Sequence, residues 1–310
     1  MKGALNVKHV AQRSHSHRRW WLLGVIVGII VALGGLFWYQ QTKSTNPRPQ
    51  TMHFVALGDS LTQGIGYADD HTGYLPALSS QLKQDYRVTL KTHNFGIGGL
   101  RSDQIDERIK TNQEEQQAIR RAQLIAITAG GNDLLQSLQS NITVDDDQKL
   151  VQKLKPAKAT YEARLTRLLS RLKQLNPKAQ IYLFGFYNPV YVYFANATAI
   201  TRAVNDWTAV NKAVAQKTAR VTYVDINNVL SRGQFTSKKA QDKLVKEGQK
   251  ASTSLRNPES ADAIIQATQS GEKNHYLSQH DHFHPNQRGY TLMARQLASA
   301  VAKVNHWTTK

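Results

Sequence analysis

The sequence predicts an α/β protein in which helices cover both faces of a parallel β-sheet. Two observations favour this fold class. From Met52 onward, short apolar runs rich in β-branched residues recur along the chain, and stretches with helical periodicity fill the gaps between them. Consecutive parallel strands need a crossover connection, which a helix usually provides, so this alternation is typical of a parallel sheet.

Five apolar runs are predicted strands. Each is short and rich in apolar and β-branched residues, which is the pattern of a strand buried on both faces. The predicted strands are His53–Leu57, Val88–Asn94, Leu124–Thr128, Gln180–Phe186 and Val221–Ile226. Ligands of such sheets bind beyond the carboxyl ends of the strands, so residues just past these runs are the first candidates for a functional site.

Apolar residues at helical spacing occupy the intervening segments. The predicted helices are Tyr74–Gln84, Ser102–Arg120, Tyr161–Leu175, Ile200–Thr218 and a final helix over about 286–304. Leu292, Leu297 and Val301 lie on one side of that final helix. An apolar stripe of this kind predicts a helix that packs against the body of the domain.

Two polar segments interrupt the alternation, at 136–158 and at 227–279. The first contains three consecutive Asp residues at 145–147, and the second is rich in Lys. Neither contains a repeat or a motif. We therefore interpret both as insertions over the edge of the sheet, where they would form a lid or a rim of a domain that spans 52–310.

The segment 20–39 predicts a transmembrane helix. It carries no charge, it has about the length that a bilayer requires, and Trp and Tyr residues occur at both ends. The basic segment 1–19 should remain in the cytoplasm, and the polar, Pro-containing segment 40–51 reads as a stalk. A cleaved signal peptide is the alternative, but bulky residues at 36–39 occupy the place of a small-residue cleavage site.

Composition narrows the classes of function. The chain has 310 residues and no Cys, which excludes disulfides and thiolate chemistry. Of its net charge of +18, residues 1–39 contribute five Lys or Arg and no acid, so the remainder is also basic. A basic surface favours anionic surroundings such as an envelope polymer, but the chain contains no nucleic-acid-binding module.

Four short blocks carry residue types that perform nucleophilic chemistry. Gly58-Asp-Ser-Leu61 follows the first predicted strand and places a hydroxyl on a turn. Gly99 follows the second strand and Asn132 follows the third, so both can present N–H donors at the same edge. Asp281 precedes His284 by three residues, which lets its carboxylate reach Nδ1 and leaves Nε2 to face a serine.

The order of these blocks resembles the GDSL, or SGNH, hydrolase family over roughly residues 52–304. The resemblance implies a three-layer α/β/α, flavodoxin-like sandwich around a five-stranded, mainly parallel sheet. It also implies that Ser60, Asp281 and His284 form a catalytic triad.

The same resemblance implies an oxyanion hole, which is a set of N–H donors for the negative charge that develops on the substrate oxygen. Its members would be the Ser60 N–H, the Gly99 N–H and the side-chain amide of Asn132. Gly98 is the alternative to Gly99, because the two glycines are adjacent.

These residues predict an extracytoplasmic serine esterase or lipase-type acylhydrolase that needs no metal and no cofactor. Acyl lipids and O-acylated envelope glycans are the expected substrates. One alternative is an acyltransferase or a glycan O-deacetylase that uses the same residues. Another is a surface binding protein that keeps the fold without turnover.

Other residues near the blocks have two readings each. Tyr187, Tyr191 and Tyr193 follow the fourth predicted strand, where they would form a platform for an acyl chain or sugar, or only pack a loop. His280 and His282 flank the proposed base and are interpreted as solvated loop residues. A zinc site in this cluster is disfavoured, because no distant third ligand is evident.

Overall fold

The structure of the protein is a computed structural model that describes residues 49–67, 72–141, 144, 146–196, 198–251 and 271–308. All of these belong to the second of two units into which the chain divides, Asn46–Lys310. The predicted tail (1–19), membrane anchor (20–39) and most of the stalk (40–51) lie outside the described residues. Within the described residues, no helix is both long and apolar enough to span a bilayer.

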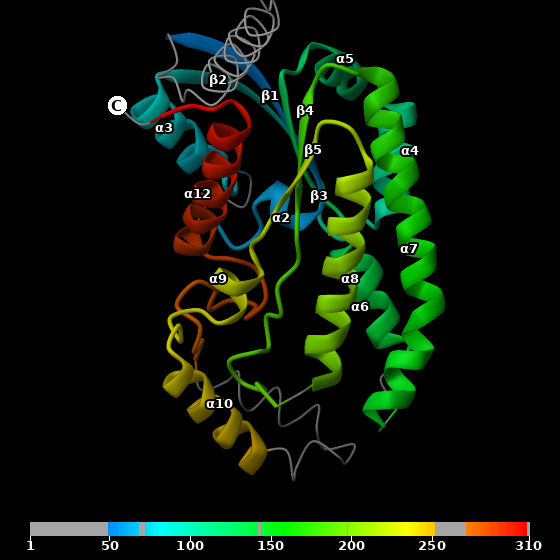
Figure 1. Ribbon diagram of the computed structural model, residues 1–310, viewed down its shortest axis with the longest axis vertical. Helices are drawn as coiled ribbons and strands as arrows, with labels where there is room; N and C mark the ends of the chain where they lie inside the picture. Colours follow the sequence, from blue (N-terminus) through cyan, green and yellow to red (C-terminus); the bar gives the residue numbers. More distant parts are fainter. Residues whose placement is uncertain are drawn as a thin grey trace, which may run out of the picture. The chain divides into compact units, whose positions relative to one another are not determined.

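Five parallel strands form one sheet with the spatial order β2-β1-β3-β4-β5 (Figure 1). The strands are β1 (Gln50–Gly58), β2 (Val88–Gly96), β3 (Leu124–Thr128), β4 (Gln180–Phe184) and β5 (Val221–Val224). The prediction of a parallel α/β sheet with these five strands is confirmed. β1 begins inside the predicted stalk, because Gln50 and Thr51 pair with Val88 and Thr89 of β2.

Side chains of the central strands alternate between two hydrophobic cores, one on each face of the sheet. Val55 and Ile125 belong to one core, while their neighbours Phe54 and Leu124 belong to the other. All four side chains are buried. A strand that is buried on both faces has no polar side to show, which explains its continuous apolar sequence.

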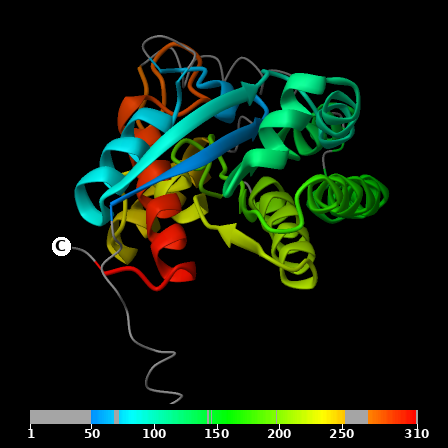
Figure 2. The same cartoon turned by 90° about the horizontal axis from the view of Figure 1, so that it is seen from above.

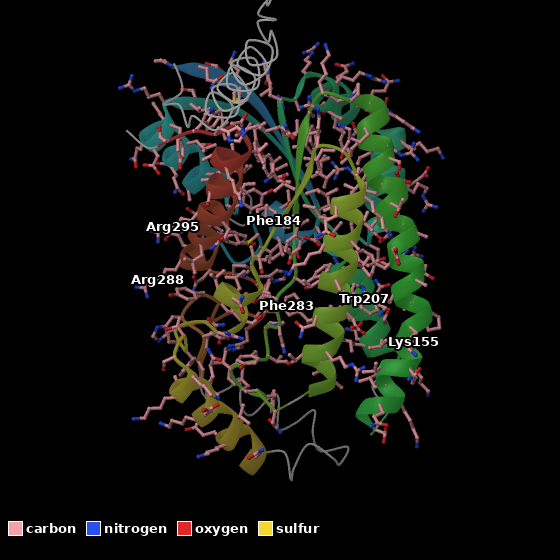
Figure 3. All side chains as sticks on the ribbon, in the orientation of Figure 1. Lys155, Phe184, Trp207, Phe283, Arg288 and Arg295 are labelled. Atoms are coloured by element: carbon pink, nitrogen blue, oxygen red, sulfur yellow. The ribbon has the colours of Figure 1, made fainter. Side chains whose placement is uncertain are left out.

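Two groups of helices cover these faces and produce three layers (Figure 2). The core with Phe54 is covered by α3 (Leu75–Tyr86) and α12 (Gln287–Val304). The other core is covered by α4 (Ser102–Thr111), α5 (Gln113–Arg121), α7 (Asp147–Leu175) and α8 (Thr198–Lys217). Arg288 and Arg295 project from the outer side of α12, as its amphipathic pattern predicts (Figure 3).

The predicted helix Ser102–Arg120 is two helices, α4 and α5. The break falls at Asn112, whose backbone is extended and whose Oδ1 accepts the Glu115 N–H at 3.1 Å. Asn is a favoured N-cap, because its side chain satisfies one of the free N–H groups at a helix start. Asn112 therefore ends one helix and begins the next.

The segment 136–158, predicted as an insertion, is mostly helical. It contains the end of α6 (Gly131–Gln139) and the first turns of α7. Asp146 caps α7, because its Oδ1 accepts the Lys149 N–H at 2.7 Å. In the first turns of this helix, Val151 and Leu154 are buried. Asp146 marks a helix start, where negative charge is favourable, and Leu138 of the same segment lines a cavity at the edge of the sheet.

The segment 227–279 contains two further helices, α9 (Asn227–Ser231) and α10 (Lys238–Ala251). Residues 252–270 lie outside the described part of the chain. The final part, from 271 onward, runs into α12. This segment therefore leads directly into the block that contains Asp281 and His284.

The carboxyl ends of three adjacent strands lie at one level of the sheet. Gly58 at the end of β1 pairs with Gly96 of β2 on one side and with Thr128 of β3 on the other. The residues that follow these ends leave the sheet at the same edge. Ser60, which begins α2, and Asn132, in the first turn of α6, therefore lie on a shared edge.

Candidate active site

Ser60 is the first residue of the short helix α2 (Ser60–Gln63), which follows β1 directly. Gly58 makes this exit from the sheet possible. Its φ is +138°, and a Cβ there would lie 2.3 Å from the Thr128 carbonyl oxygen, so no larger residue fits. Asp59 then caps α2, because its Oδ1 accepts the Leu61 N–H at 3.1 Å.

The structure brings Ser60, Asp281 and His284 together. His284 Nε2 lies 2.8 Å from Ser60 Oγ, and His284 Nδ1 lies 2.6 Å from Asp281 Oδ2. Asp281 Oδ1 also accepts the N–H groups of Phe283 and His284, each at 3.0 Å. Because an ionised carboxylate only accepts hydrogen bonds, Nδ1 of a neutral His284 carries the proton and Nε2 accepts from the Ser60 hydroxyl.

Asp281 is held in its ionised form. Partial burial acts to raise the pKa of its carboxyl, but the hydrogen bonds from the His284 ring and from two backbone N–H groups outweigh burial. The pKa of Asp281 therefore falls to about 2. An ionised carboxylate at this position fixes the ring orientation of His284 and favours the imidazolium when it forms.

The turn that contains Gly98 and Gly99 lies beside Ser60. A Cβ on Gly98 would lie 3.8 Å from Ser60 Cβ, and the Gly98 N–H donates to Gln63 Oε1 at 2.6 Å. Gly99 has a φ of +80°, and among the described residues its N–H has no acceptor. These contacts leave the Gly99 N–H, and not that of Gly98, available to a ligand.

Asn132 is the second residue of α6, on the same edge as Ser60. One N–H of its side-chain amide donates to the Leu100 carbonyl oxygen at 2.9 Å. An amide nitrogen carries two N–H groups, so one remains for a ligand. Both Asn132 and Ser60 line the cavity described below.

The Asp133 carboxylate connects the two segments that carry the donors Gly99 and Asn132. Its Oδ2 accepts the Ser102 N–H at 2.8 Å, and its Oδ1 accepts the Ser102 hydroxyl at 2.9 Å and Arg164 Nη1 at 3.1 Å. Asp133 is buried and adjoins Asn132, while Ser102 begins α4 just past Gly99. The relative position of Asn132 and Gly99 thus depends on this carboxylate.

Asp59 and Thr128 form a buried hydrogen-bonded pair beneath Ser60. The Thr128 hydroxyl donates to Asp59 Oδ1 at 2.8 Å, and the Asp59 N–H donates to Thr128 Oγ1 at 3.2 Å. Burial raises the pKa of Asp59 despite these bonds. Because Thr128 ends β3, this pair joins the exit of β1 to the neighbouring strand.

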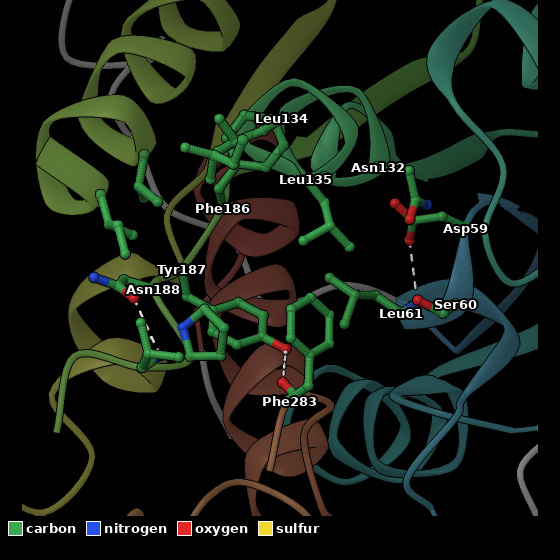
Figure 4. A pocket seen from close by; sticks show the side chains of 16 residues that line it. Asp59, Ser60, Leu61, Asn132, Leu134, Leu135, Phe186, Tyr187, Asn188 and Phe283 are labelled. Carbon is green, nitrogen blue, oxygen red and sulfur yellow. Dashed lines mark hydrogen bonds between the residues drawn. The ribbon is translucent and has the colours of Figure 1, made fainter. Parts of the chain in front are cut away.

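A cavity of about 270 Å³ opens beside Ser60 (Figure 4). Most of its wall is apolar and comes from α6, α8, the segment after β4 and the loop before α12. The apolar lining residues are Leu61, Leu134, Leu135, Leu138, Phe186, Tyr187, Pro189, Val190, Ile200, Val204 and Phe283. Asn188 lies at the end away from Ser60 in Figure 4. An apolar cavity with few polar groups at one end suits a ligand with a hydrocarbon part and one reactive polar group.

The three tyrosines predicted as a rim have different places. Tyr187 lines the cavity, and its hydroxyl donates to the Phe283 carbonyl oxygen at 2.6 Å. Tyr191 and Tyr193 are not part of the cavity wall. The Tyr193 hydroxyl instead accepts the Lys273 N–H at 2.9 Å and fastens the loop.

The interpretation of His282 as a solvated residue is wrong. Its Nδ1 lies 2.8 Å from Glu272 Oε2, and the Glu272 side chain is only 2% exposed. No sequence pattern predicted this contact, because Glu272 lies in a polar segment without a motif. Within the described residues, no group of three or more His, Cys, Asp or Glu side chains is arranged to hold a metal ion.

Sequence reasoning also missed most of the cavity wall. Leu134, Leu135 and Leu138 lie on α6 just after Asn132, and Ile200 and Val204 lie on α8. Their helical spacing was visible, but apolar helix positions usually face the core. The local sequence pattern is the same for an apolar residue that packs in the core and for one that lines a cavity beside the core.

In α/β enzymes that hydrolyse esters, a serine, an imidazole and a carboxylate meet in this arrangement at one edge of the sheet. The family follows from comparison with known proteins. The profile of the GDSL-like lipase/acylhydrolase family matches residues 56–292. The chain therefore belongs to this family, and it is an ester-hydrolysing enzyme.

Individual relatives are similar at lower identity. The chain is 27% identical over 250 residues to YpmR of Bacillus subtilis, a protein described as uncharacterized. The matched region covers 80% of this chain and 81% of YpmR. It is 26% identical over 139 residues to the spore germination lipase LipC of Bacillus licheniformis, across 45% of this chain and 65% of LipC. The crystal structure of the lipase Lip_vut3 from a goat rumen metagenome matches with a TM-score of 0.55 and 21% identity. It covers 80% of this chain and 97% of Lip_vut3, which shows the shared fold.

The depressed pKa of Asp281 predicts a contribution to acid stability. Ionised Asp281 should stabilise the fold above the ordinary carboxyl pKa of about 4, and this contribution should be lost as the pH falls toward 2. We expect the free energy of unfolding in urea to fall more between about pH 5 and pH 3 for the native chain than for Asp281→Asn. Equal losses would mean that the carboxylate is not stabilised in the folded state.

Proposed function

We propose that the chain is a serine esterase in which Ser60 is the nucleophile, His284 the general base and Asp281 the residue that orients it. The observation that carries this proposal is the 2.8 Å contact between Ser60 Oγ and His284 Nε2 beside an apolar cavity. A nucleophile, a base within hydrogen-bond distance of it, and a third group that orients the base are the three parts that nucleophilic catalysis requires.

Acylation of the enzyme would proceed in two steps. Ser60 Oγ attacks the ester carbonyl carbon while its proton passes to His284 Nε2, and the carbonyl oxygen becomes an oxyanion. The N–H groups of Ser60 and Gly99 and the free amide N–H of Asn132 then donate to this oxyanion. The tetrahedral intermediate collapses, the bond to the alcohol oxygen breaks, and His284 gives its proton to the departing alcohol.

Deacylation would repeat this chemistry with water. His284 Nε2 takes a proton from a water molecule, whose oxygen attacks the acyl carbon on Ser60. The second intermediate expels Ser60 Oγ, which recovers its proton from His284, and the carboxylic acid leaves. An alcohol in place of water would make the enzyme an acyltransferase.

The cavity favours esters with acyl chains of medium length. A cavity of about 150 Å³ accommodates benzene, so a volume of about 270 Å³ has room for about ten carbon atoms. Each buried CH₂ group contributes about 0.8 kcal/mol, which is about fourfold in kcat/KM. The name of the relative LipC, a lipase, supports an acyl lipid as the substrate.

We further propose that the enzyme is anchored in the cell membrane with its catalytic domain outside. The support is the uncharged segment 20–39 with aromatic residues at both ends, which follows a basic segment. An anchored esterase would act on esters within reach of the membrane surface, such as lipids or envelope polymers. The basic composition of the chain favours an anionic polymer nearby.

Substitution of the proposed nucleophile and of one oxyanion donor should separate their roles. Ser60→Ala should lower kcat on a p-nitrophenyl ester by about 10⁴-fold or more, and Asn132→Ala by about 10²–10³-fold. Ser80→Ala, an exposed position on α3, is the matched control and should retain full activity. Turnover that persists in Ser60→Ala would remove Ser60 from the mechanism. An absence of turnover on any ester by the native, folded chain would favour a binding function.

Chain-length preference tests the cavity. We expect kcat/KM for p-nitrophenyl esters to rise from two to about ten acyl carbons and to fall for sixteen. Ile200→Trp, on the wall of the cavity, should lower kcat/KM about tenfold for the decanoyl ester and leave the butyryl ester unchanged. Ala209→Trp, exposed on the same helix, should change neither. A native optimum at two carbons would instead favour acetyl esters, as an O-deacetylase requires.

Proteolysis of cells without walls tests the topology. With one epitope tag at each end of the chain, protease added outside should remove the C-terminal tag and spare the N-terminal tag. After lysis, both tags should be digested. Protection of both tags before lysis would place the domain inside the membrane and contradict the proposed orientation.

A further inference from the structure

The loop with Asp281 and His284 has little regular structure to hold it. It is closed at its base by a single antiparallel bridge between Leu277 and Pro285 and by the Ser278 N–H, which donates to the His284 carbonyl oxygen at 2.8 Å. Residues 278–284, here called the 278–284 loop, extend from this base. The position of His284 therefore depends on contacts that the loop makes with its surroundings.

A second imidazole–carboxylate pair lies in this loop, next to the first. His282 Nδ1 lies 2.8 Å from Glu272 Oε2, and Glu272 Oε1 accepts the Asn274 N–H at 2.6 Å. The side chains of Glu272 and His282 are 2% and 19% exposed. A buried carboxylate is costly unless its oxygens are hydrogen-bonded, so the Glu272 carboxylate favours loop positions that keep His282 in contact.

The backbone of His282 adds to this constraint. Its φ is +55°, in the left-handed region that few residues other than glycine adopt. Its N–H donates to the Ser278 carbonyl oxygen at 3.0 Å. Such a conformation persists only where surrounding contacts hold it, and the side-chain bond to Glu272 is such a contact.

Glu272 itself is fixed to the body of the domain. Two residues later, the fully buried Asn274 donates from Nδ2 to the Leu230 carbonyl oxygen at 2.6 Å. One residue later, the Lys273 N–H donates to the Tyr193 hydroxyl at 2.9 Å. The carboxylate is therefore held by the α9 segment and by the loop after β4, which do not belong to the 278–284 loop.

We propose that Glu272 and His282 form a positioning pair that holds the 278–284 loop so that His284 Nε2 stays in hydrogen-bond contact with Ser60. This inference rests on the proposed serine mechanism. Neither residue touches the reacting atoms. Misplacement of a reacting group by about 1 Å can lower a rate about 100-fold, so a loose loop would impair turnover. Within this loop only Phe283 lines the acyl-chain cavity, so most of the cavity wall would stay in place.

Substitutions of His282 separate the hydrogen bond from the backbone conformation. His282→Gly keeps the left-handed backbone at no steric cost but removes the donor. His282→Asn also tolerates this backbone, and its Nδ2 occupies nearly the place of Nδ1. In full-length enzyme, kcat for the octanoyl ester should fall about 10- to 100-fold in His282→Gly, with a much smaller change in KM, because Phe283 is the loop's only contribution to the cavity wall. His282→Asn should stay within about threefold of the native kcat.

Glu272→Ala shows whether both residues act through the same bond. In the Glu272→Ala background, His282→Asn and His282→Gly should have the same kcat, because no acceptor remains for the Asn side chain. The kcat is expressed per active site, titrated with a phosphonofluoridate, so that a loss of folded enzyme does not count as slower turnover. If Glu272→Ala yields little folded protein, Glu272→Leu replaces it, since its side chain fills a larger part of the space and offers no hydrogen-bond acceptor to position 282.

Two results would overturn the inference: native kcat in His282→Gly, or an advantage of Asn over Gly that persists without the Glu272 carboxylate. Ser60→Ala, assayed in parallel, keeps this failure separate from failure of the proposed function. If Ser60→Ala is inactive while every variant at 282 is fully active, only the positioning pair is wrong. If Ser60→Ala remains active, the serine mechanism itself is wrong.

Discussion

The hydrogen bond between Ser60 and His284 joins two residues that are 224 positions apart, and several parts of the fold are needed to form it. Ser60 follows β1, which lies between β2 and β3 in the sheet. His284 lies just before α12, which packs with α3 against the same face of that sheet. The Tyr290 hydroxyl of α12 donates to the Ile65 carbonyl oxygen at 2.7 Å and ties this helix to the segment after α2. Packing of the last helix thus brings the imidazole to the serine.

Two of the three proposed oxyanion donors, Gly99 and Asn132, are held independently of this bond. Gly99 and Asn132 follow β2 and β3, and the Asp133 carboxylate connects their loops through Ser102. The imidazole comes from the opposite end of the chain and depends on α12 and the 278–284 loop. Displacement of that loop can therefore change proton transfer while Gly99 and Asn132 stay in place, so a positioning pair near the imidazole would affect kcat more than binding in the cavity, to which the loop contributes only Phe283.

The sequence predicted the central strands β1, β3 and β4 well because strands buried on both faces need continuous apolar runs, a pattern that tertiary context does not obscure. In the edge strand β2 only Val88 is buried, and its prediction rested on its β-branched residues. Three of the four blocks were found because each follows a strand end, where a parallel sheet gathers its ligands, and the fourth from the three-residue spacing of Asp281 and His284. The helical structure of the segment 136–158 was not predicted, since an acidic run signals a helix start as readily as a loop. The contact of His282 with Glu272 could not be predicted, because it joins two irregular segments whose approach depends on tertiary packing. The cavity wall escaped notice for the same reason.

The identity of the nucleophile is the central claim, and covalent labelling tests it most directly. The native chain is reacted with a phosphonofluoridate, which modifies only a serine activated by a neighbouring base, and its peptides are analysed by mass spectrometry. We expect one adduct, on the peptide that contains Ser60, and no adduct when His284 is replaced by Ala. An adduct on another serine, or an equally rapid adduct on Ser60 without the imidazole, would contradict it.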